Sequence, residues 1–277
     1  MRLQVEHHTR YSFTEPQARV VQLLRLIPHD AAHQTVVHWR IDVDCDARLR
    51  EGRDGYGNAI RMLYAEGPLE HIGITVTGEV LLTQADGRVS GTPEPLPPAL
   101  FLRPTLQTAA TPELTAFAQG VAGEGATPER LRRLARAIQA RWPVARDARA
   151  PIRSAAEVFE APRATPRCMA QLFVAAARSL GVPVRYVSGY SLEGDAERRT
   201  AAPHGWAEAW VEDAAGGGGW LAFDPSTGGV PDLDHVRLAV ALDAAGAAPI
   251  AGTRIGHGGT EALDVDVHLS DVGDEGE

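Results

Sequence analysis

The sequence predicts an α+β protein in which an antiparallel β domain precedes a domain of helices and antiparallel strands. Three observations support this prediction. Alternating apolar residues, typical of strands, run from the N-terminus to about residue 90. A proline-rich stretch interrupts the pattern at residues 91–98. Beyond it, helix-start signals come first and further strand patterns follow, as expected where helices and strands are segregated along the chain.

The N-terminal part contains two segments with the period of two that is typical of a half-buried strand. Alternate residues from Trp39 to Cys45 are apolar and fall on one face, and residues 72–80 alternate in the same way. The cluster 53–58, RDGYGN, lies between these segments and is rich in turn-forming residues. This arrangement predicts antiparallel strands joined as a hairpin.

The proline-rich stretch and the residues after it predict a linker and two helices. Four prolines in the eight residues 91–98 indicate a stiff, extended connection, which we place at residues 91–105. Thr127 and Pro128 provide an N-cap and a first helical residue for a helix that should end before Pro143. Residues 165–181 repeat this signal, because Thr165-Pro166 begins a second pattern that ends at Leu180 before glycine.

Strand patterns return after the second helix. The candidates are residues 184–190, 204–212, 220–223, 234–242 and 262–269. We therefore expect an N-terminal β domain at residues 1–90, the linker at 91–105, and a core domain at 106–277.

Length and charge exclude several classes of protein. A chain of 277 residues, 44% of them hydrophobic, is long enough to bury a substantial core. Its formal net charge of −9 argues against a nucleic-acid partner, which would need clustered basic residues. No stretch approaches the roughly 18 consecutive apolar residues of a membrane helix, and the first residues lack the apolar run of a signal peptide. We expect a cytoplasmic protein without membrane association, in which Cys45 and Cys168 are free thiols.

Three residues in the second half have the order of a thiol acyl-transfer site. Cys168 stands near the start of an apolar helix, and His204 and Asp224 follow on predicted strands. In such a site the helix N-terminus favours the thiolate, the imidazole accepts the thiol proton, and the carboxylate orients the imidazole. The spacing alone is not specific, because the chain also contains 10 His and many Asp residues.

The residues around these positions resemble bacterial transglutaminase-like proteins. The matching segments are the helix and strand at 170–190, the HGWAEAWV strand at 204–211, the GWLAFDP strand at 219–225, and the N-terminal segments RYSF at 10–13, LRLIP at 24–28 and DGYGN at 54–58. The resemblance spans nearly the whole chain. It implies a papain-like α+β core, with a central helix packed on an antiparallel sheet, behind an N-terminal β domain. It also implies a Cys-His-Asp triad that makes or breaks amide bonds, and a peptide-ligating or peptide-modifying pathway as the context.

This sequence departs from the family pattern at the nucleophile. An ungapped match through Arg178 puts the family's cysteine, which stands twelve residues before that arginine, at Pro166, whereas Cys168 stands ten before it. With Pro166 at 0° on a helical wheel of about 100° per residue, Phe173 lies near 340° and Cys168 near 200°. The thiol is therefore expected on another side of the helix. Pro166 also lacks the backbone N–H that helps to bind an oxyanion in papain-like sites.

Two interpretations follow. The first is a pseudoenzyme that binds a peptide or protein partner in the cleft, as a scaffold subunit or regulator of such a pathway. The alternative is an active cysteine amidase, protease or acyltransferase that uses Cys168 with His204 and Asp224. No cofactor or metal site is expected, because the histidine pairs at residues 7–8 and at 29 and 33 lack a matching second pair or acidic partner.

Overall fold

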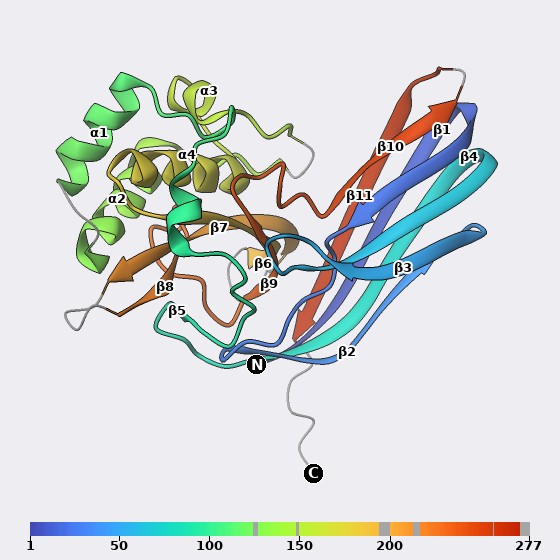
Figure 1. Cartoon of the computed structure of the whole chain (residues 1–277), viewed down its shortest axis with the longest axis horizontal. Coiled ribbons are helices and arrows are strands. Elements are labelled where there is room, and N and C mark those ends of the chain that lie inside the picture. Colours follow the sequence, from blue (N-terminus) through green and yellow to red (C-terminus); the bar gives the residue numbers. More distant parts are fainter. Residues whose placement is uncertain (124–126, 148–149, 194–199, 213–216, 257, 272–277) are drawn as a thin grey trace, which may run out of the picture.

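The computed structural model describes the 277-residue chain except for residues 124–126, 148–149, 194–199, 213–216, 257 and 272–277. It contains two antiparallel β-sheets and a group of helices, so the predicted α+β class is confirmed. The larger sheet lies at one end of the molecule and the helices lie at the other, with the smaller sheet between them (Figure 1). No helix in the described part of the chain is both long and apolar enough to cross a membrane.

The larger sheet, called here the N-terminal sheet, is built on two long strands. β1 (Arg2–Leu24) pairs antiparallel with β4 (Ala59–Leu82) along most of its length. The strand order is β10-β1-β4-β2, with β11 also pairing with β1 and β3 with β4. The other strands are β2 (Gln34–Val43), β3 (Ala47–Arg53), β10 (Ile250–Gly256) and β11 (Glu261–Asp271).

The predicted alternation appears on the buried face of this sheet. Ile72, Ile74 and Val76 on β4 are buried, and the apolar residues of β2 from Trp39 pack against the same cluster. The predicted turn joins β3 to β4, where the Asp54 carboxylate accepts the backbone N–H groups of Tyr56 and Asn58. Such side-chain acceptors satisfy turn amides that would otherwise lack partners.

The smaller sheet, called here the core sheet, carries the C-terminal half of the chain. Its order is β5-β8-β7-β6-β9, and all of its pairs are antiparallel. The strands are β5 (Arg88–Val89), β6 (Val184–Glu193), β7 (Thr200–Glu212), β8 (Gly218–Phe223) and β9 (His235–Ala241).

One α-helix lies at the centre of the helical group. α4 (Pro166–Ser179) is buried along nearly its whole length and packs against β6 and β7. Around it lie η1 (Pro98–Leu102), α1 (Pro112–Ala122), α2 (Pro128–Arg141) and α3 (Ala155–Phe159). Both predicted helices are confirmed with their threonine N-caps, and Gly181 follows α4 with a φ of 79°. α1 and α3 were not among the predicted elements.

The proline-rich stretch follows β5 of the core sheet and is held against that sheet. Glu94 accepts hydrogen bonds from both terminal nitrogens of Arg185, at 2.7 and 3.0 Å, and from the indole of Trp220. Within the stretch placed in the linker, residues 98–102 form η1, whose Phe101 is buried. A stiff proline-rich segment therefore lies along the core sheet rather than spanning open solvent.

The last two strands return to the first sheet. β10 and β11 both pair with β1, at residues 17–24 and 3–13 respectively. The sequence-based division had placed these strands in the core range 106–277. The structure differs because β1 is long enough to pair with both of them, one after the other along its length.

Candidate functional site

The first turn of α4 determines which side chain reaches the predicted site. Thr165 caps the helix, its hydroxyl accepting the backbone N–H of Cys168, and Pro166 occupies the first turn. Pro166 lines a cavity of about 240 Å³ together with His204 and Asp224. Cys168 does not line that cavity; it is 1% exposed and belongs to the apolar cluster around α4.

His204 and Asp224 meet because two neighbouring strands present them. His204 lies in β7, Asp224 follows β8 directly, and the two strands pair antiparallel with Ala207 opposite Phe223. The Nε2 atom of His204 lies 3.0 Å from Oδ2 of Asp224. The other carboxylate oxygen accepts the backbone N–H of Ser226 at 2.8 Å and its hydroxyl at 2.7 Å. Both oxygens of the buried Asp224 carboxylate therefore have hydrogen-bond partners.

A second histidine, which the sequence analysis did not single out, completes this cluster. His235 begins β9, and its Nε2 atom lies 3.3 Å from the same Asp224 oxygen. Its Nδ1 atom lies 2.5 Å from Oδ1 of Asp234. His235 could not be recognised as a site residue from its sequence spacing to Asp224 or from the strand pattern. Its position in the site depends on the pairing of β9 with β6.

Burial and hydrogen bonding act in opposite directions on this cluster. Burial alone would raise the pKa of Asp224, but His204 and His235 outweigh it and hold the pKa of the carboxyl well below its usual range. Burial would lower the pKa of His235, but hydrogen bonds to Asp224 and Asp234 raise it instead. The cluster thus keeps a carboxylate ionised in a site with almost no solvent exposure.

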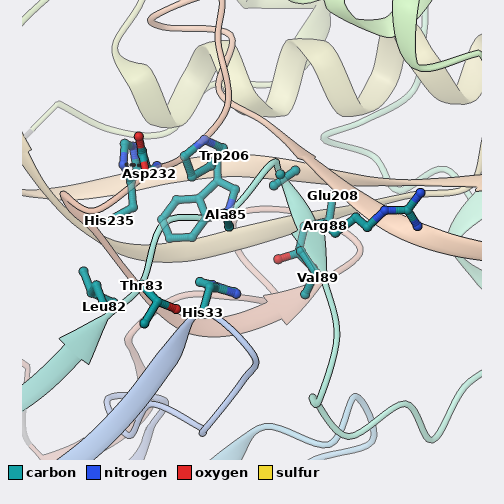
Figure 2. Close-up of a pocket in the computed structure, with 13 residues that line it drawn as sticks. His33, Leu82, Thr83, Ala85, Arg88, Val89, Trp206, Glu208, Asp232 and His235 are labelled. Atoms are coloured by element: carbon teal, nitrogen blue, oxygen red, sulfur yellow. Dashed lines mark hydrogen bonds between the residues drawn. The ribbon is translucent and has the colours of Figure 1, made fainter. Parts of the chain in front are cut away.

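Aromatic packing fixes the orientation of His235. Its ring meets that of Trp206 edge-on, with centroids 5.4 Å apart, and lies 5.2 Å from the ring of His204. Figure 2 shows Trp206 and His235 beside a small cavity of about 20 Å³, which Glu208 and His33 also line. That cavity is about the size of one water molecule, so the larger cavities are the candidates for ligand binding.

A second large cavity, of about 340 Å³, lies where the two sheets meet, and His204 borders it as well. The N-terminal sheet contributes His7, Leu263 and others, while β6 contributes Tyr186 and Ser188. The hydroxyl of Ser188 has no hydrogen-bond partner among the described residues, although Ser188 is only 5% exposed. A buried hydroxyl without a partner is a place where a ligand can supply one.

The histidine pairs noted in the sequence do not converge. His7 contacts Tyr190 and Thr9, whereas His8 bonds to Thr75 and to the exposed Glu6. His29 bonds instead to backbone groups of Gly57 and Ala59. In the described part of the chain, the residues that bring three potential metal-ligand atoms within 4.8 Å of one another are His204, Asp224 and His235.

Two family models match separate parts of the chain. Residues 3–81 match the family model described as the bacterial transglutaminase-like N-terminal region, and residues 115–225 match that of the transglutaminase-like superfamily. The chain belongs to the transglutaminase-like superfamily. The second match includes α4 and ends just after Asp224, so it contains the Cys168, His204 and Asp224 of the predicted triad.

Similar proteins align with nearly the full length of this transglutaminase-like chain. The uncharacterized protein ML0607 of Mycobacterium leprae is 24% identical over 290 residues, covering 97% of this chain and 98% of its own. The uncharacterized protein Rv2569c of Mycobacterium tuberculosis is 24% identical over 300 residues, with coverage of 97% and 92%. The crystal structure of a "putative cysteine protease" from Cytophaga hutchinsonii superposes with a TM-score of 0.74 at 17% identity, covering 100% of this chain and 92% of that one. This last likeness establishes the shared fold.

Proposed function

We propose that this chain is a catalytically degenerate transglutaminase-like protein. It binds a peptide or protein segment in the cavity between its two sheets, beside His204, without reacting with it. The observation that supports this proposal is the position of Pro166, which lines the cavity beside His204 and Asp224 where the family pattern places the thiol. The imidazole and the carboxylate remain paired at 3.0 Å. None of the described residues that line this cavity carries a thiol.

Covalent catalysis in such a site needs a sulfur atom that attacks a carbonyl carbon while the imidazole accepts the thiol proton. Pro166 supplies neither a thiol nor a backbone N–H for the developing oxyanion. Loss of one oxyanion donor by itself typically lowers the rate by about 10²–10³-fold. Cys168 would have to leave an apolar cluster in which it is 1% exposed.

Binding is supported by the 340 Å³ cavity between the sheets, whose volume lies within the range of small-ligand sites. Aromatic and aliphatic side chains from both sheets line it, and Ser188 offers an unpartnered hydroxyl. A peptide segment would match this lining, because its apolar side chain could pack on the apolar walls and its backbone amide could bond to the Ser188 hydroxyl. We infer a peptide partner for this reason. The proposed role as subunit or regulator in a peptide-ligating or peptide-modifying pathway rests instead on what the family resemblance implies.

The catalytic half of the proposal is tested with Pro166→Cys and Cys168→Ala, assayed for hydrolysis of a peptide amide in the presence of a chelator. Wild type should show no turnover above the Cys168→Ala variant. Pro166→Cys should gain turnover, because it restores a thiol on the cavity side and a backbone N–H. Wild-type turnover that Cys168→Ala abolishes would overturn the proposal in favour of an active Cys168 enzyme.

The binding half is tested with a displayed random-peptide library selected on the wild-type chain. Leu263, 50% exposed, lines the cavity, whereas Ile255, 58% exposed, does not. Leu263→Glu should weaken the selected peptides by at least ~10-fold, since it places a charge at the apolar wall. The matched control Ile255→Glu should leave their affinity unchanged. Equal affinities for both variants, or a selection without binders, would contradict a peptide-binding role for this cavity.

A further inference from the structure

We propose that His204, Asp224 and His235 form a binding site for one divalent transition-metal ion, for which zinc is the best-fitting ion. The three residues come from β7, from the end of β8 and from the start of β9, so the folded core sheet brings them together. The inference goes beyond the proposed function. It requires only these side chains, whether or not the cleft also binds a peptide.

The spacing of the ligand atoms fits such an ion. Zinc binds histidine nitrogen and carboxylate oxygen at about 2.0–2.2 Å, which puts the ligands of a tetrahedral ion about 3.3–3.6 Å apart. Oδ2 of Asp224 lies 3.0 Å from Nε2 of His204 and 3.3 Å from Nε2 of His235. Each of the three residues offers one ligand atom that lies within 4.8 Å of a ligand atom of the other two. Small side-chain rotations are therefore enough to close them around one ion.

The groups behind two of these ligands orient them toward the same point. Asp234 contacts Nδ1 of His235, so Nε2 faces Asp224. A carboxylate on the second nitrogen of a metal-binding histidine fixes its tautomer and increases its basicity. The Ser226 backbone N–H and hydroxyl bind Oδ1 of Asp224, which leaves Oδ2 for the ion. The outer contacts that a metal site needs are thus already present.

The 240 Å³ cavity supplies access and an open coordination position. All three ligands line it, together with Ser226, Thr227 and Asp234, which are polar. The Asp224 and Asp234 carboxylates offset the charge of a dication, while the cationic Arg146, which also lines the cavity, is exposed and can extend into solvent. Three protein ligands with a fourth position open to a cavity is the pattern of zinc sites that accept a water molecule or a ligand atom.

The test uses the untagged chain, stripped with a chelator and titrated with Zn²⁺ against a chromophoric competitor. Wild type should bind one ion per chain. His235→Ala should weaken zinc by at least ~100-fold, and Asp234→Asn, at a partly exposed position, by about 10–100-fold. The control His268→Ala removes a histidine that is 64% exposed and bonded to Asp266, and should change nothing.

Two results would overturn the proposal. One is a wild-type chain that binds no stoichiometric zinc at about 100 μM, a concentration well above the dissociation constants of structural zinc sites. The other is equal zinc affinity for wild type, Asp234→Asn and His268→Ala, which would place the ion elsewhere. Asp234→Asn keeps the second outcome measurable even if His235→Ala fails to fold. Neither outcome bears on whether the chain binds peptides, because the peptide assays contain no zinc.

Discussion

Pro166 and Cys168 stand two residues apart in the first turn of α4, yet they face different parts of the molecule. Pro166 lines the 240 Å³ cavity with His204, whereas Cys168 is 1% exposed in the apolar cluster around the helix. Two residues rotate the side-chain direction by about 200° on an α-helix. A rotamer change at Cys168 therefore cannot place its sulfur where Pro166 stands; the first turn would have to unwind.

The first prediction follows from this difference in direction. In a Cys45→Ser background, iodoacetamide should label Cys168 in the native chain at least ~100-fold more slowly than in the unfolded chain, because the sulfur must wait for local opening. A thiol introduced as Pro166→Cys should be labelled faster than Cys168 in the native state, because position 166, although buried, lines the 240 Å³ cavity. Mass spectrometry of timed samples measures both rates. Native labelling of Cys168 at the unfolded rate would contradict the buried position.

The second prediction concerns Glu94, which ties the proline-rich connection to the core sheet. Its carboxylate bonds to two nitrogens of Arg185, a side chain that is 1% exposed. Glu94→Gln should lower the free energy of unfolding by about 1–2 kcal/mol, because a charge-assisted pair of hydrogen bonds is lost. Chemical denaturation measures this change. Glu70→Gln, at an exposed position of β4, is the matched control and should be neutral.

Local chemistry explains why several elements could be predicted from sequence. Thr127 and Thr165 each accept a backbone N–H three residues later, and each precedes a proline. These caps need no information from distant parts of the chain, so the start of α2 and the start of α4 were predicted correctly. The direction of the Cys168 side chain relative to Pro166 could also be predicted from the sequence, because helix geometry fixes the angle between neighbouring side chains.

Non-local pairing explains what the sequence did not reveal. β10 contains two glycines in seven residues and is half-exposed, and it forms a strand by pairing with β1, more than 200 residues earlier. His235 likewise reaches Asp224 only because β9 pairs with β6, which in turn pairs with β7. No spacing within one segment encodes such a contact. A histidine directly after an aspartate, as in Asp234-His235, is too common to indicate the cluster alone.

The third prediction concerns the stability of the chain in acid. Burial would raise the pKa of Glu208, but the charges of Arg237 and Arg185 outweigh it and lower the pKa to about 2. This carboxylate therefore stabilises the fold fully above pH 4.5, its ordinary pKa, and the contribution disappears as pH falls toward 2. The difference between a pKa of 4.5 and one of about 2 corresponds to about 3 kcal/mol.

Glu208→Gln should accordingly lose about 3 kcal/mol or more at pH 7, because two buried guanidinium groups lose their shared partner. Its free energy of unfolding should also fall less steeply than that of wild type between pH 4.5 and 3. Urea denaturation at several pH values measures both effects. Glu212→Gln, exposed on the same strand, should retain the wild-type slope. Identical slopes for Glu208→Gln and wild type would show that Glu208 titrates normally in the folded chain.

The fourth prediction concerns His7, which lines the 340 Å³ cavity and bonds to Tyr190 and Thr9. Burial, with the neighbouring His8, lowers its pKa from 6.5 to about 4. Between these values the unfolded chain binds a proton that the folded chain does not, so stability should fall by about 3 kcal/mol from pH 6.5 to pH 4. His7→Gln should remove that dependence, whereas His268→Gln, at a side chain 64% exposed, should preserve it. A wild-type pH profile retained by His7→Gln would mean that His7 has the same pKa in the folded and the unfolded chain, so that the cavity would become charged as the pH falls below about 6.5.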